Sequence, residues 1–144
     1  MYDVDSLQLI EVTLNSSIVR GPNGLALSDD FRYLFVADYR LQTLIQFDLV
    51  NRSLIRNFPS NYSASQNPNS VAYIPQLDAV LFNPCLLFFH FRHSFCEAPI
   101  VMLFPNDTEV LFYAGGSFEG ISLDGDIVYV TDRGSGIVIP SRSC

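Results

Sequence analysis

The stretch GPNGLALSDDFRYLFVADYRLQTLIQFDL, residues 21–49, determines how the rest of the sequence is interpreted. It holds three apolar runs, and the third alternates apolar and polar residues as a half-buried strand does. The runs are 25–27, 33–37 and 43–47, with predicted turns at 21–24 and 28–30. A fourth run at 53–58 follows a predicted turn at 50–52. Four short strands joined by tight turns predict a four-stranded antiparallel sheet.

The first of these strands recurs twice in the sequence. PNGLAL at 22–27 aligns with PNSVAY at 68–73 and with FEGISL at 118–123. Further apolar runs follow the later copies at 76–82, 126–132 and 137–139, with a predicted turn at 133–136. A repeated unit of this length predicts a repeat architecture. A four-stranded sheet is too small to bury its faces alone, so face-to-face packing around a shared axis is expected. The predicted fold is all-β and consists of β-propeller blades.

The copies divide the sequence into a single partial propeller over residues 1–144. Residues 1–20, with an alternating run at 7–14, are the predicted strand of a preceding blade, and the blades are expected at 21–60, 66–114 and 117–144. The Ser- and Asn-rich segment between the first two blades is a predicted loop. At 84–105 the repeat becomes irregular and shows no recognisable turn, and we interpret this segment as an insertion or as an error in the gene model such as retained intron sequence. Propellers close with about four to eight blades, so an incomplete ring is predicted.

The composition indicates a protein with a substantial core and an acidic surface. The 144 residues are 49% apolar, and the formal net charge is −7. A chain of this length can bury a core. Without a basic cluster, neither nucleic acid nor an anionic membrane surface is an expected partner. The most apolar run, 79–89, is too short for a membrane span.

Cysteines and glycosylation sequons bear on the compartment, which stays open. Cys85, Cys96 and Cys144 lack the close paired spacing of a zinc site, and both a Cys85–Cys96 disulfide and free buried thiols are compatible with the sequence. The first residues have neither the basic nor the apolar part of a secretory signal. Four sequons nevertheless favour an extracellular origin and a glycoprotein, with acceptors at Asn15, Asn51, Asn61 and Asn106.

Aspartates end the second strand of the first and third copies. We expect Asp38 and Asp132 to accept hydrogen bonds from backbone N–H groups of the following turn, which is a structural role. Asn83 occupies the equivalent position in the second copy.

The catalytic residues stay unknown at the level of sequence. His90 and His93 lie in no recognisable motif, and on one strand a spacing of three would place them on opposite faces. The sequence contains no nucleophile elbow, zinc-protease motif, P-loop or EF-hand loop.

Residues 22–30 together with 33–38 resemble the blade motif PNGLAxSPDGxxLYVADS of the regucalcin and gluconolactonase family, to which paraoxonases and strictosidine-synthase-like proteins are related. The third copy, at 119–121 and 129–132, is equally similar to NHL repeats and to YWTD blades. About two thirds of the chain takes part. The resemblance implies a six-bladed propeller with one divalent cation, usually calcium, at one end of the central channel.

The resemblance also implies which side chains hold that cation. In this family the Asn of the PNG motif is a metal ligand, which corresponds to Asn23 here. Asn69 and Glu119 occupy the same position in the next two copies, although the family's ligand Glu belongs to a different blade. The innermost strands start beside the axis, so their oxygen-bearing side chains converge, and such oxygens suit a hard cation. The alternative is that Asn23 and Asn69 are turn residues and Glu119 is a solvated carboxylate.

The implied chemistry is metal-assisted hydrolysis of a lactone or ester, in which the cation polarises the carbonyl while water attacks. Because the chain accounts for about half of a ring, we expect weak or no activity from it alone. The alternative function is a non-catalytic module of NHL or YWTD type whose loops bind a protein or peptide partner.

Overall fold

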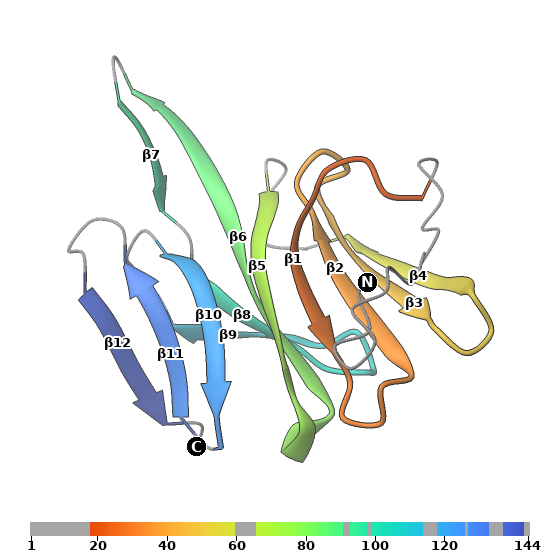
Figure 1. Cartoon of the computed structure of the whole chain (residues 1–144). Coiled ribbons are helices and arrows are strands. Elements are labelled where there is room, and N and C mark those ends of the chain that lie inside the picture. Colours follow the sequence, from red (N-terminus) through yellow and green to blue (C-terminus); the bar gives the residue numbers. More distant parts are fainter. Residues whose placement is uncertain are drawn as a thin grey trace, which may run out of the picture.

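The computed structural model of the chain describes residues 18–59, 66–90, 93–97, 99–113, 118–125, 127–132 and 137–142. Within these ranges the long elements are all strands, and the only helical element is the 3-10 turn η1 (Pro75–Leu77) (Figure 1). The all-β class is therefore confirmed. None of the helical structure in the described ranges is long and apolar enough to cross a membrane.

The first sheet is a four-stranded antiparallel meander, as predicted. Its strands follow the chain order β1 (Pro22–Leu27), β2 (Tyr33–Asp38), β3 (Thr43–Asp48) and β4 (Ser53–Pro59). The polar turns at 28–30 and 50–52 are also confirmed. The turn predicted at 21–24 is wrong, because residues 22–24 belong to β1.

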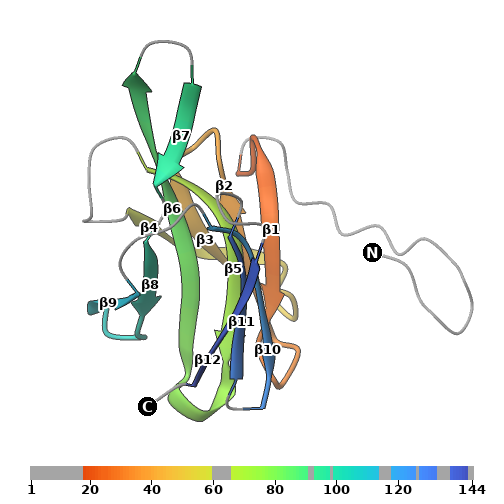
Figure 2. The ribbon, with the colours of Figure 1, turned by 90° about the vertical axis from the view of Figure 1, so that its left-hand side faces the viewer.

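The second sheet has five strands. They are β5 (Gln66–Ile74), β6 (Ala79–His90), β8 (Ile100–Leu103) and β9 (Glu109–Tyr113), with β7 (His93–Glu97) paired only to β6. The strand predicted at 76–82 begins only at Ala79, because Pro75 starts η1 and Asp78 adopts a left-handed conformation with φ +47°. The far half of β6 and all of β7 form a hairpin arm that extends beyond the sheet (Figures 1 and 2).

The irregular segment 84–105 forms regular strands, including the hairpin arm. That segment contains the far half of β6, all of β7 and all of β8, and the chain reverses direction between β6 and β7. His90 and His93 therefore lie on two strands and face each other as Cα partners. The prediction that they occupy opposite faces of one strand is wrong. The side chains of these histidines, and the three cysteine side chains, lie outside the described part of the structure.

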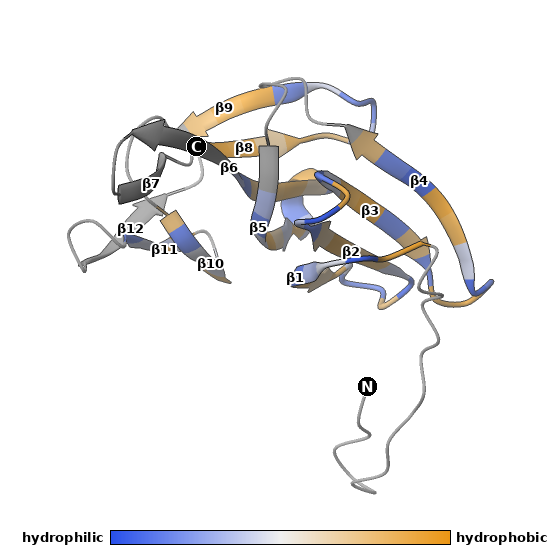
Figure 3. Ribbon diagram, turned by 90° about the horizontal axis from the view of Figure 1, so that it is seen from above, coloured by the Kyte–Doolittle hydropathy of each residue, from blue (hydrophilic) through white to orange (hydrophobic). Residues whose placement is uncertain are grey.

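The third sheet contains β10 (Phe118–Asp124), β11 (Ile127–Asp132) and β12 (Ile137–Arg142) in chain order. Seen from above, the three sheets fan out, with β1, β5 and β10 near one another and β4 and β9 away from them (Figure 3). The predicted strand at 7–14 lies outside the described residues.

The second sheet packs on both neighbours through the two-residue alternation of its strands. Val80 and Phe82 of β6 belong to a core shared with β2, β3 and β4, whereas Ala79 and Leu81 belong to a core shared with β10 and β11. Phe82 is 2% exposed and Leu81 fully buried. Burying a side chain of this size contributes about 1.5–3 kcal/mol, so these cores hold the sheets face to face.

Candidate metal centre

Each of the three first strands contains a register shift near its beginning. The shifts lie between Pro22 and Gly24, between Pro68 and Val71, and between Phe118 and Gly120. The skipped positions are Asn23 in β1, Asn69 and Ser70 in β5, and Glu119 in β10. A bulge of this kind changes the direction of the extra residue's side chain and is common beside functional sites. All three residues predicted as metal ligands are thus bulge residues.

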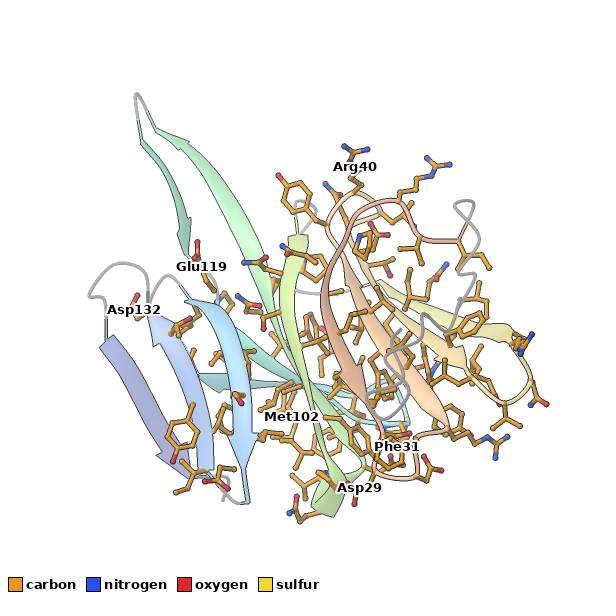
Figure 4. The ribbon with its side chains drawn as sticks, viewed as in Figure 1. Asp29, Phe31, Arg40, Met102, Glu119 and Asp132 are labelled. Atoms are coloured by element: carbon orange, nitrogen blue, oxygen red, sulfur yellow. The ribbon has the colours of Figure 1, made fainter. Side chains whose placement is uncertain are left out.

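The structure brings two of these three side chains into contact. Asn23 Nδ2 donates a hydrogen bond to Asn69 Oδ1, across 46 positions of sequence. Glu119 is exposed and is the second residue of the neighbouring strand β10, at the end of the sheets where β5 also begins (Figure 4). The backbone of Asn23 and Gly24 does not have positive φ, so the alternative of a tight turn at Pro-Asn-Gly is excluded.

The close approach of β1 to β5 depends on a glycine. A β-carbon on Gly24 would lie 2.9 Å from Ser70 Cα, which is closer than packing allows. Glycine is therefore required here for space and not for its conformational freedom. The contact between the two asparagines follows from this approach.

A buried amide joins β5 to the third sheet. Asn83 is fully buried, its Oδ1 accepts a hydrogen bond from Ser70 N at 2.6 Å, and its Nδ2 donates one to Phe118 O at 2.5 Å. Ile121 N donates to Ser70 Oγ at 3.0 Å. The starts of β5 and β10 are therefore linked by polar contacts as well as by the apolar core. The repeat located Asn83 in the sequence but could not predict this link, because the link joins two sheets.

Asp38 has the structural role that the sequence predicted. Its carboxylate accepts hydrogen bonds from Arg40 N and Leu41 N of the following turn, at 2.9 and 2.8 Å, and from Arg20 N and Gly21 N, at 2.6 and 3.0 Å. Burial raises the pKa of Asp38, but these four N–H donors together outweigh it, so the net pKa lies below its usual 3.8. The corresponding role of Asp132 stays a prediction.

Asp48 plays a similar part that was not predicted from the sequence. Its Oδ1 accepts hydrogen bonds from Val50 N and Asn51 N, at 2.9 and 2.8 Å. The signal was present, since Asp48 ends a strand before a turn as Asp38 does.

Asn51, one of the sequon residues, donates its side-chain Nδ2 to Asp48 Oδ2 at 2.9 Å. The sequon residue Asn106 is exposed in the turn before β9, whereas Asn15 and Asn61 lie outside the described residues.

A hollow lies between the first two sheets, and none of the three bulge residues lines it. It has a volume of about 220 Å³ and aromatic walls that include Tyr33, Phe35 and Phe58. The Arg56 guanidinium lies 3.9 Å from the Phe58 ring centroid and donates from Nη1 to Asp107 Oδ1 at 2.6 Å. The charge of Arg56 is thus neutralised within the protein, so this hollow is a weak candidate for an anion site.

The three bulge residues form a set of oxygen donors suited to a hard cation. Two amides and one carboxylate offer about four oxygens at most, whereas calcium takes about six to eight. Water and groups outside the described residues would supply the remainder. The part of the chain that the structure describes contains no group of three or more His, Cys, Asp or Glu side chains able to hold a metal. A cation site within it therefore depends on the asparagine oxygens.

Comparison with known proteins bears on the fold alone. No protein-family model matches the sequence, and no curated protein matches it. Structural similarity extends to 130 chains of known structure. One of these, Kuenenia stuttgartiensis hydrazine synthase, matches over 84% of this chain and 36% of its own length, with a TM-score of 0.54 and 14% identity. The chain thus spans about a third of that protein.

Proposed function

We propose that the three sheets are blades of an incomplete β-propeller and that Asn23, Asn69 and Glu119 bind one divalent cation, calcium, where the innermost strands begin. The sheets pack face to face and their first strands lie side by side (Figure 1). By its resemblance to the gluconolactonase-like family, the site would serve hydrolysis of a lactone or ester.

The observation that carries the proposal is the contact between Asn23 and Asn69. Both side chains leave bulges at the same position of the repeat, and turn formation does not explain them. The terminal torsion of an Asn side chain is broad and roughly two-fold, so rotation would direct both carbonyl oxygens at one ion. Glu119, at the same position in the third sheet, supplies the negative charge.

This donor set suits Lewis-acid chemistry. When bound, the cation would polarise a carbonyl oxygen and stabilise the charge that develops on it. Two neutral amides and a single carboxylate would hold the ion without cancelling its charge. Among the described residues no catalytic base is assigned, and activity of this chain alone is expected to be weak because much of a ring is missing.

The alternative is a non-catalytic module whose loops bind a protein or peptide. The hydrogen bond between Asn23 and Asn69 favours it in one respect, because the Oδ1 of Asn69 already has a partner within the protein. In that case the bulges serve only to join the first two sheets.

Calcium titration during thermal unfolding separates the two functions. A ligand that binds only the folded state stabilises it by about 2.7 kcal/mol at one hundred times its dissociation constant, so the midpoint should rise with calcium. Asn23→Ala should abolish the rise, whereas Asn23→Asp retains an oxygen donor and should preserve it. Asn57→Ala, at an exposed position of β4, is the matched control and should respond as the wild type does. No rise at millimolar calcium would favour the binding module.

A further inference from the structure

We propose that Asn83 is a positioning residue that holds the second bulge against the start of the third sheet and thereby sets Asn69 and Glu119 relative to each other. This inference rests on the proposed cation site. It assigns to a buried amide a role in cation affinity, although Asn83 itself does not contact the ion.

The two groups that Asn83 binds lie beside two of the three proposed ligands. Its Oδ1 accepts from Ser70 N, and its Nδ2 donates to Phe118 O. Ser70 directly follows Asn69, and Phe118 directly precedes Glu119. One side chain therefore fixes the backbone next to both ligands.

The chemistry of the site requires an amide at this position. In the first sheet the equivalent residue is Asp38, whose carboxylate accepts hydrogen bonds only. Asn83 must satisfy one N–H and one carbonyl at once, which an amide can do and an ionised carboxylate cannot. Asn83 is fully buried and its bond to Phe118 O lies in the interior, so leaving that carbonyl without a partner would be costly.

A nearby contact that does not include Asn83 reports on the same pair of strands. Ile121 N donates to Ser70 Oγ, so β5 and β10 are also joined just beyond the proposed ligands. If Asn83 fixes the distance between these strands, this hydrogen bond should weaken when Asn83 is removed. The exchange rate of the Ile121 amide hydrogen thus measures the arrangement independently of cation binding.

The test compares Asn83→Ala with Met102→Ala on the full chain. Met102 is 7% exposed and belongs to the core between the second and third sheets, so its truncation weakens the same interface without touching the polar link. Hydrogen exchange at Ile121 is followed by NMR, and calcium affinity by titration calorimetry. Asn83→Ala should speed exchange at Ile121 more than Met102→Ala does. It should also weaken calcium binding roughly 10-fold to 100-fold, the usual effect of removing a group that orients a ligand. Met102→Ala should leave the affinity unchanged.

The outcomes separate this inference from the proposed function. If wild-type protein binds calcium and both variants bind equally well, the positioning role is overturned. Equal exchange at Ile121 in the two variants also overturns it. If the wild type does not bind calcium, the cation site is overturned, and exchange at Ile121 alone decides whether Asn83 holds the strands. Should Asn83→Ala fail to fold, Asn83→Asp retains the acceptor for Ser70 N but loses the donor to Phe118 O, and it should show the same faster exchange at Ile121.

Discussion

A β-carbon placed on Gly24 would lie 2.8 Å from the carbonyl oxygen of Asn69, although the two residues belong to different sheets. Neither backbone can move away freely, because each is held in an antiparallel pair with its own second strand. The first two sheets therefore meet through backbone at this point. Any side chain at position 24 must push β1 and β5 apart.

Gly24→Ala should accordingly destabilise the protein and disturb the pair formed by Asn23 and Asn69. Overpacking of this kind costs about 1–3 kcal/mol, which urea unfolding would measure. The calcium response proposed above should be lost with it. A variant that keeps both wild-type stability and the full calcium response would contradict the close contact.

Gly125→Ala is the matched control for this prediction. Gly125 has φ +56°, and a β-carbon placed on it would contact no heavy atom within 4 Å. Alanine at this position would therefore have a strained backbone conformation but no steric clash. A left-handed alanine costs about 1–2 kcal/mol. The calcium response should survive, since the turn between β10 and β11 lies at the far end of β10 from Glu119.

Local patterns were sufficient to predict the first sheet, whereas contacts between sheets were not predictable. The alternation in 43–47 and the polar turns located β2 and β3 because strand pairing there is local. Pro22-Asn23-Gly24 was misread as a turn because the reason for the glycine lies in Asn69, far away in sequence. The repeat nevertheless identified the three bulge residues, since equal positions in a repeat occupy equal positions in the fold. The link through Asn83 and the pairing of Arg56 with Asp107 join distant segments and left no sequence signal.

Asp38→Asn should be strongly destabilising at neutral pH. The amide would direct at least one donor at a site whose four backbone partners are all donors. Hydrogen bonds to charged groups contribute about 1.5–3 kcal/mol, so a loss of at least about 2 kcal/mol is expected. Urea unfolding at pH 7 measures it.

The pH dependence of that loss gives a separate prediction. The pKa of Asp38 is lowered in the folded protein, so its carboxylate stabilises the fold at pH values above its usual pKa of 3.8. This stabilisation is lost as the pH falls through the pKa of the folded state. The difference in the free energy of unfolding between the wild type and Asp38→Asn should thus be constant near neutrality and shrink below pH 3.8. Asn57→Ala, at an exposed position of β4, removes no titratable group and is the control, so its free energy of unfolding relative to the wild type should not change over the same pH range. A difference that stays constant down to low pH would argue against the four-donor site.

Arg56 should matter more to stability than its ion-pair partner Asp107. Its Nε donates to Gln46 Oε1 at 3.0 Å and its Nη2 to Pro105 O at 3.2 Å, and it also stacks on Phe58. Arg56→Ala removes all of these contacts and should cost roughly 1–2 kcal/mol. Asp107→Asn preserves an acceptor, and asparagine tolerates the positive φ of 64° at this position. Because the Asp107 side chain is 67% exposed, this substitution should lower the free energy of unfolding by less than about 1 kcal/mol. Urea unfolding of both variants tests the order, and an equal loss would mean that the charge pair dominates.

Tyr73 should ionise at higher pH than an ordinary tyrosine. Partial burial raises the pKa of its hydroxyl, and the hydrogen bond that the hydroxyl donates to Asp78 Oδ1 at 2.6 Å raises it further. The neutral ring, stacked on Phe35 with centroids 5.7 Å apart, is favoured in the folded state. Its contribution to stability should therefore be complete below the usual pKa of 10.0 and be lost as the pH rises through the folded value. The ultraviolet phenolate titration of wild type minus that of Tyr73→Phe isolates this residue from the other six tyrosines. Asp78→Asn should remove only part of the increase in the pKa of Tyr73, since burial of the hydroxyl persists. A pKa of 10.0 in this variant would assign the whole increase to Asp78.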